Sequence, residues 1–77
     1  MTKRIPVTSY IVFKVLQGKG FVILRRSGSH LRLKHPDGRI TTVPIHGKEA
    51  IGTGLLFRIL KDVDVSKEEF DRLSREI

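Results

Sequence analysis

Apolar and polar positions follow two different periods along this chain, and the change of period predicts the order of its elements. Near the start, apolar residues recur at helical spacing on one face, at Val12, Val15 and Leu16. We expect this helix to begin after Thr8 or Ser9, because either side chain can accept a hydrogen bond from a first-turn amide. Gly18 and Gly20 should end it, since glycine tolerates the left-handed conformation that follows many helices.

The next three apolar stretches have the composition and the period of β-strands. We expect strands over residues 21–26, 30–35 and 39–44. The first is rich in β-branched and aromatic residues, which is typical of a half-buried strand. The second, HLRLKH, alternates strictly, so Leu31 and Leu33 should share one face while His30, Arg32 and Lys34 share the other.

Short turn sequences separate these strands. Ser27-Gly28 should connect the first strand to the second. Pro36-Asp37-Gly38 should connect the second to the third, with proline presetting φ and glycine supplying a positive φ. Pro44 ends the third strand, because proline has no amide to donate to a ladder. Together these signals predict a three-stranded antiparallel meander.

Two further stretches return to helical spacing. The first runs from Thr53, a candidate cap, and places these apolar residues on one face: Leu55, Leu56, Ile59, Leu60 and Val63. The second begins with a capping box, Ser66 and Glu69. The predicted fold class is therefore α+β, a two-layer α-β-β-β-α domain with an added C-terminal helix. If the helices cover the leucine face of the sheet, its other face stays exposed and basic.

Length and charge narrow the classes of function. A chain of 77 residues makes one small domain, residues 1–77, of which 1–5 should form a loose basic arm. Residues 1–48 hold ten Lys or Arg and one acid, a net charge of +9, whereas residues 49–77 hold five basic and seven acidic residues, a net charge of −2. A basic surface of this kind binds nucleic acid, an anionic membrane or an acidic protein. No cysteine is present, and no apolar run approaches the ~20 residues of a membrane span, so we expect a cytoplasmic protein.

Four segments carry a resemblance to a known family. GFVILRRSGSH, HPDGRITTVPIH, GLLFRILKD and VSKEEF resemble, in order and spacing, segments of the HicA-type mRNA interferase toxins, also called the YcfA-like family. The resemblance covers about Val7 to Phe70. It implies metal-free cleavage of mRNA, while the element order α-β-β-β-α with a basic exposed sheet resembles the fold of the double-stranded-RNA-binding domain. It also implies neutralisation by a cognate HicB-type antitoxin, and a catalytic histidine in Gly-Ser-His, here His30. The chain departs from the family pattern at Leu31, where many members carry a second histidine, and at Thr53, where proline is frequent.

The residues around His30 suit this chemistry. Metal-free cleavage uses the 2′-OH of the RNA as nucleophile, so the protein must supply a proton acceptor or donor and positive charge. Histidine as a residue type exists in both protonation states near neutral pH. The candidate RNA contacts are Gly28, Ser29, Arg26, Arg32 and Lys34. Since Arg25 and Arg26 leave opposite faces of their strand, at most one of them can join this cluster.

The other two histidines have different expected roles. His35 precedes the Pro-Asp-Gly turn and should be structural, whereas His46 can equally face RNA or be inert. The spacing of the three histidines matches no common zinc pattern and no cysteine assists, so we expect no metal and no cofactor.

Two alternatives to an endoribonuclease remain open from the residues alone. One is a noncatalytic RNA-binding domain with the same charge and fold, in which His30 is only a contact. The other is a protein-interaction module whose basic face recognises an acidic partner.

Overall fold

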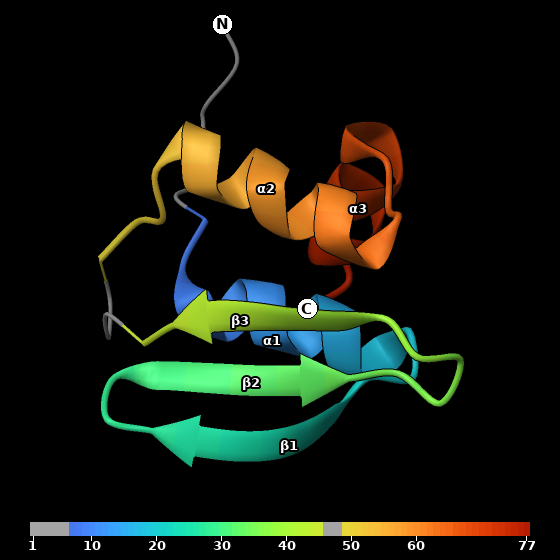
Figure 1. Ribbon diagram of the computed structural model, residues 1–77. Coiled ribbons are helices and arrows are strands. Elements are labelled where there is room, and N and C mark those ends of the chain that lie inside the picture. Colours follow the sequence, from blue (N-terminus) through green and yellow to red (C-terminus); the bar gives the residue numbers. More distant parts are fainter. Residues whose placement is uncertain (1–6, 46–48) are drawn as a thin grey trace, which may run out of the picture.

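The computed structural model describes residues 7–45 and 49–77. Its elements follow the predicted order, with three helices, α1 (Ser9–Gly18), α2 (Thr53–Val63) and α3 (Lys67–Ser74), and three strands, β1 (Val22–Ser27), β2 (His30–Lys34) and β3 (Ile40–Pro44). The strands form one antiparallel sheet in the order β1-β2-β3 (Figure 1). The fold is α+β and like that of the double-stranded-RNA-binding domain, as predicted. The expected N-terminal arm, 1–5, lies outside the described residues.

The helix ends confirm two of the three predicted caps. The Thr8 hydroxyl accepts a hydrogen bond from the Ile11 amide at 3.3 Å, and the Ser66 hydroxyl accepts one from the Glu69 amide at 3.1 Å. The prediction for α2 was wrong, because Gly52 is the N-cap and Thr53 is already the first helical residue. Gly52 has extended backbone angles there but no side chain to bond the first turn, so this helix start lacks a side-chain cap.

The hydrophobic core lies between the helices and one face of the sheet. The completely or almost completely buried side chains come from all three helices, from β2 and β3, and from the segments between them, with Phe21, Phe70, Leu16, Leu33 and Ile59 the largest. Leu33 is buried and Leu31 packs against the core, while His30, Arg32 and Lys34 are exposed on the other face. The alternation of HLRLKH therefore placed both faces of β2 correctly.

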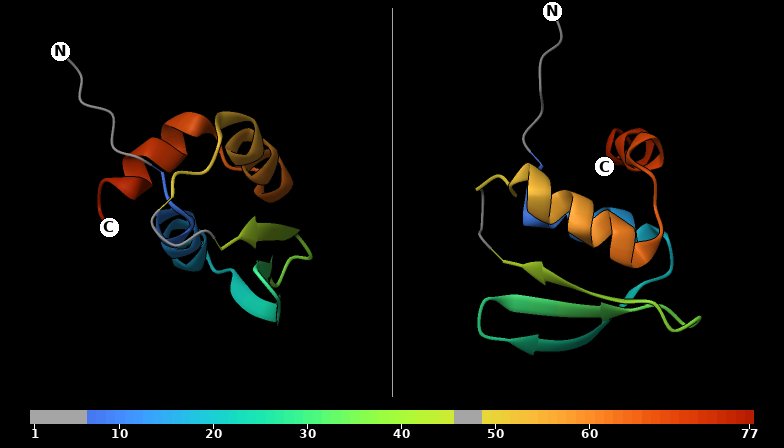
Figure 2. Two further views of the ribbon diagram at one scale, coloured as in Figure 1. Left: turned by 90° about the vertical axis from the view of Figure 1, so that its left-hand side faces the viewer. Right: turned by 45° about the horizontal axis from the view of Figure 1, so that its top comes forward.

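Strand β1 departs from the prediction of a half-buried strand. Only Phe21, which precedes it, is buried, and all six residues of β1 are exposed. Val22, Ile23 and Leu24 expose 61%, 54% and 51% of their surface. Figures 1 and 2 show the reason: the helices gather beside β3, and β1 forms the outer edge of the sheet on the side away from them. The β-branched composition correctly indicated a strand, but it did not indicate that the helices leave this strand exposed.

The register of the hairpin decides which β1 side chains face the same way as His30. Arg25 lies opposite Arg32, Arg26 opposite Leu31, and Ser27 opposite His30. The pairing shifts between Ile23 and Arg25, which leaves Leu24 as the extra residue of a β-bulge. Strand β3 continues the same face, because Thr42 lies opposite Arg32.

Candidate functional site

A two-residue turn holds His30 at the start of β2. The turn consists of Gly28 and Ser29, one position later than the predicted Ser27-Gly28 connection, because Ser27 is still paired with His30. Gly28 has a φ of 58°, a left-handed value that favours glycine at this position of a tight hairpin. The Ser29 carbonyl accepts a hydrogen bond from the Ile45 amide at 2.6 Å, which ties the turn to the end of β3. The position of His30 is therefore set by two neighbouring strands.

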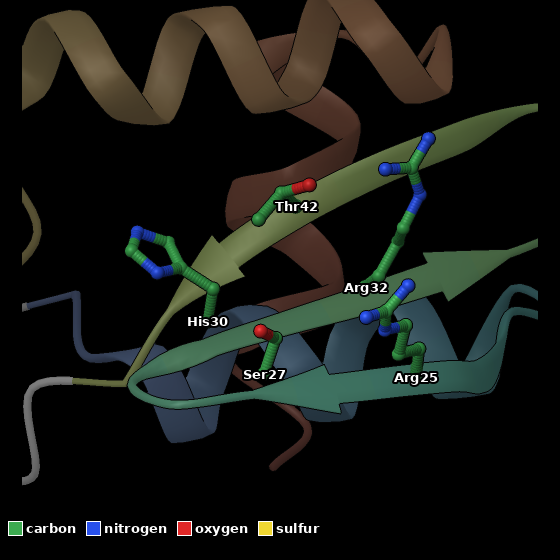
Figure 3. Close-up of a pocket in the computed structure, with 5 residues that line it drawn as sticks. All are labelled: Arg25, Ser27, His30, Arg32 and Thr42. Carbon is green, nitrogen blue, oxygen red and sulfur yellow. The ribbon is translucent and has the colours of Figure 1, made fainter.

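His30 lies at the edge of a shallow hollow on the exposed face of the sheet. The hollow has a volume of about 290 Å³ and is lined by Arg25, Ser27, His30, Arg32 and Thr42 (Figure 3). The cross-strand pairs explain this set, since residues directly opposite one another point to the same face. The lining therefore combines one imidazole, two guanidinium groups and two hydroxyl groups.

The His30 imidazole is available for chemistry. Within residues 7–45 and 49–77 it has no hydrogen bond and no ion pair, and the residue is exposed. An exposed ring without a hydrogen-bond partner in the described residues can accept a proton from a bound substrate or donate one to it. The structure thus places the predicted catalytic residue where a phosphodiester could reach it.

His35, in contrast, has both ring nitrogen atoms engaged by its own protein. Its Nε2 lies 3.1 Å from the Lys19 carbonyl oxygen, and its Nδ1 lies 3.1 Å from the Asp37 amide. A carbonyl requires a donor and an amide requires an acceptor, so these partners assign the neutral ring with its proton on Nε2. The His35 Nδ1 also lies 3.0 Å from a carboxylate oxygen of Asp37. Because Nδ1 carries no proton in this assignment, the contact is not an ion pair. The ring packs on Phe21 with centroids 5.1 Å apart, which confirms the structural role expected for His35.

The turn after His35 is anchored to the helical layer by Arg39. Its Nε donates to the Asp37 carboxylate at 2.8 Å, and its Nη1 donates to the Val63 carbonyl oxygen at the end of α2. The pKa of Asp37 lies below its usual value, mainly because its carboxylate accepts a hydrogen bond from the Arg39 amide. The one acid of the first half of the chain is therefore engaged at the far end of the hairpin from His30.

Positive charge in the hollow has no acidic counterpart among the described residues. No salt bridge in that part of the chain involves Arg25, Arg26, Arg32 or Lys34. The carboxylates that do form ion pairs lie on α3 or in the Pro36-Asp37-Gly38 turn. The exposed face of β1 and β2 is therefore an uncompensated cationic surface, which suits a polyanion.

The predicted RNA contacts divide between the two faces of the sheet. His30 and Arg32 line the hollow, Lys34 follows on the same face, and Gly28 and Ser29 form the adjacent turn. Arg26 lies on the opposite face, because its partner Leu31 packs toward the core. The structure places Arg25 in the position that the sequence prediction had given to Arg26. A two-residue loop pairs the residues at its two ends, so counting outward from Ser27 and His30 would have found Arg25.

The structure neither provides nor suggests a metal site in its described part. Among residues 7–45 and 49–77, no three His, Cys, Asp or Glu side chains gather closely enough to hold a metal ion. His46, for which the sequence left two roles open, lies outside these residues. None of the helices in the described ranges is long and apolar enough to cross a membrane.

Comparison with known proteins agrees with this arrangement. The family model described as HicA toxin of bacterial toxin-antitoxin matches residues 11–65, more than half of the chain. The chain belongs to the HicA toxin family. No curated protein matches the sequence. Membership makes this HicA chain a toxin of a toxin-antitoxin system, and such a system implies a cognate antitoxin as its protein partner. The match extends from α1 to the end of α2, so it includes the whole sheet and the His30 hollow of the HicA fold.

Proposed function

We propose that this HicA toxin is a metal-independent endoribonuclease that cleaves mRNA, with His30 as its general acid and base. The observation that carries the proposal is the position of an unengaged imidazole at one end of a hollow lined by two arginines and two hydroxyl groups. The family supports it, since HicA toxins act as ribonucleases. The cationic face supports it because RNA offers one negative charge per nucleotide.

The reaction that fits these residues is transesterification within the RNA. The 2′ oxygen forms a bond to the adjacent phosphorus, and the bond between phosphorus and the 5′ oxygen breaks. His30 accepts the proton of the 2′-OH and can return a proton to the leaving 5′ oxygen, so the imidazole ends in its starting state. The products are a 2′,3′-cyclic phosphate and a 5′-OH. The positive potential of the cationic face as a whole stabilises the charge that develops on the phosphate oxygens.

Binding of the RNA chain would be shared along the face of the sheet. Arg32 and Lys34 occupy alternate positions of β2 on the His30 side, where they can contact successive phosphates. The Gly28-Ser29 turn can bring backbone amides or the Ser29 hydroxyl close to the backbone. Arg26, on the other face, would contact only RNA that wraps around the β1 edge. The same cationic face is the surface that a HicB-type antitoxin would cover to silence the toxin.

The deciding experiment is cleavage of long single-stranded RNA by the purified chain in the presence of a chelator. We expect fragments ending in 2′,3′-cyclic phosphate, and a loss of about 100-fold or more in His30→Ala, the usual scale for a positioned proton-transfer group. His35→Gln is the matched control, and it should cleave at a similar rate once folded. RNA that is retained but never cut would show instead a noncatalytic RNA-binding domain. Cleavage by His30→Ala at the normal rate would refute the assigned role of His30.

A further inference from the structure

Arg25 and Arg32 form an unusual pair in this sheet. They lie directly opposite each other on neighbouring antiparallel strands, so their side chains leave the sheet on the same face. Like charges placed directly opposite on two strands are destabilising. Neither arginine has an ion-pair partner or a hydrogen bond to its side chain within the described residues. Two arginine side chains therefore line the same hollow, and no carboxylate of the described residues forms an ion pair with either of them.

The two guanidinium groups lie away from the imidazole. In Figure 3 the His30 ring is at one end of the hollow and the side chains of Arg25 and Arg32 are at the other. The hydroxyl-bearing side chains of Ser27 and Thr42 lie between them. Guanidinium groups present a planar fork of donors that matches the oxygens of a phosphate, and two of them can grip one phosphate from two sides.

We propose that Arg25 and Arg32 together bind the RNA phosphate that neighbours the scissile one, and so set the register of the strand over His30. His30 and Arg32 are two positions apart on the same face of β2, about 7 Å along the strand. This separation is comparable with that between neighbouring phosphates of an RNA chain, so one phosphate at His30 places the next at the arginine pair. The inference rests on the proposed RNA cleavage, because it takes His30 as the site of the scissile phosphate.

The chain provides its own matched control for this proposal. Arg26 is the same residue type as Arg25, is its neighbour on the same exposed strand, and points to the other face. Replacing either arginine with glutamine removes the same charge and the same length of side chain. A difference between the two variants therefore reports position on the sheet and not net charge.

The first measurement is binding of a 2′-O-methyl oligonucleotide of mixed sequence, which has the phosphates of RNA but cannot be cleaved. Arg25→Gln and Arg32→Gln should each weaken binding by about tenfold, as expected for a charged hydrogen-bonded contact. Each should also reduce the slope of log affinity against log salt by about 0.7, the value for one contact to a single strand. Arg26→Gln should leave both nearly unchanged. Equal effects for Arg25→Gln and Arg26→Gln would overturn the proposal.

A second measurement locates the phosphate. A 2′-O-methyl strand with one ribonucleotide has a single cleavable position, and a neutral methylphosphonate can replace the flanking phosphate on the 5′ or the 3′ side. For the wild type, one of these two replacements should lower binding and kcat/KM by about tenfold. In Arg25→Gln and Arg32→Gln the same replacement should cause little further loss, because the partner of that phosphate is already absent. In Arg26→Gln the same methylphosphonate replacement should lower binding and kcat/KM as much as it does in the wild type.

The outcomes separate this inference from the proposed function. If the methylphosphonate lowers affinity as much in Arg25→Gln as in the wild type, the arginine pair does not bind that phosphate, whatever His30 does. If the pair behaves as expected but His30→Ala cleaves normally, the phosphate site stands and the assigned role of His30 fails. If neither flanking replacement affects the wild type, no neighbouring phosphate is bound and the inference is wrong.

Discussion

Lys19 Nζ and Glu69 Oε2 lie 2.7 Å apart and join the end of α1 to the first turn of α3. This contact explains why the capping box at Ser66 is only half formed: Ser66 bonds the Glu69 amide, but the Glu69 carboxylate reaches Lys19 on another helix. The hydrogen bond from Lys19 holds the pKa of Glu69 below its usual value of 4.5.

This pair predicts a dependence of stability on acid. A carboxyl group whose pKa is lower in the folded state stabilises the fold above its unfolded-state pKa, and the contribution disappears as the pH falls through the lowered value. The free energy of unfolding should therefore decrease as the pH falls below about 4.5. Glu69→Gln should remove part of this decrease in urea titrations at several pH values. Glu68→Gln, a neighbour without an ion pair among the described residues, is the control and should leave the dependence unchanged.

His30 and His35 should differ in their effect on stability. His30→Ala removes an exposed side chain with no partner in the described chain, so unfolding should change by no more than about 0.5 kcal/mol. His35→Ala removes two hydrogen bonds and the contact with Phe21, so it should destabilise by about 1–3 kcal/mol. Thermal or chemical denaturation of both variants measures this contrast. A strongly destabilised His30→Ala would mean that the ring has a structural role.

Gly28 should be required for its backbone conformation. A Cβ at this position would meet no atom within 4 Å, so only the left-handed φ of 58° opposes a side chain. Gly28→Ala should therefore destabilise by about 1–2 kcal/mol and displace His30 at the end of the turn. Gly54, inside α2 and equally uncrowded, should respond oppositely, with Gly54→Ala stabilising by about 0.5–1 kcal/mol. Denaturant midpoints test both predictions. An unchanged midpoint for Gly28→Ala would contradict the claim that the backbone conformation at this position requires glycine.

The cognate antitoxin should use the same face as the RNA. A partner that silences the toxin by covering His30 must lie over Arg32 and Lys34, and it should be acidic there. The double replacement of Arg32 and Lys34 with glutamine should weaken the complex by about tenfold or more and flatten its salt dependence. Arg58→Gln, on the exposed surface of α2, is the control and should change neither the affinity of the complex nor its salt dependence. An undiminished complex would place the inhibitory contact elsewhere.

Local sequence patterns were enough to predict the order of the elements and the two faces of β2. Helical spacing in α1, strict alternation in HLRLKH and the oxygen-bearing caps Thr8 and Ser66 act between residues a few positions apart, so they can be recognised without knowing the rest of the fold. The Pro36-Asp37-Gly38 turn belongs to the same group, since its glycine has the positive φ that the sequence predicted. The exposure of His30 was predicted in this way too, from its place in an alternating strand, whereas its catalytic role is an expectation from the family resemblance.

Local patterns could not predict which side chains lie near His30, or that all residues of β1 are exposed. The choice of Arg25 over Arg26 depends on cross-strand register, which the two-residue loop and the bulge at Leu24 set together. The exposure of β1 depends on where the helices pack, and they pack near β3 although β1 is just as apolar. The partner of Glu69 lies 50 positions away on another helix. These features arise from contacts between distant segments, whose free energies depend on the whole packing and leave no local period in the sequence.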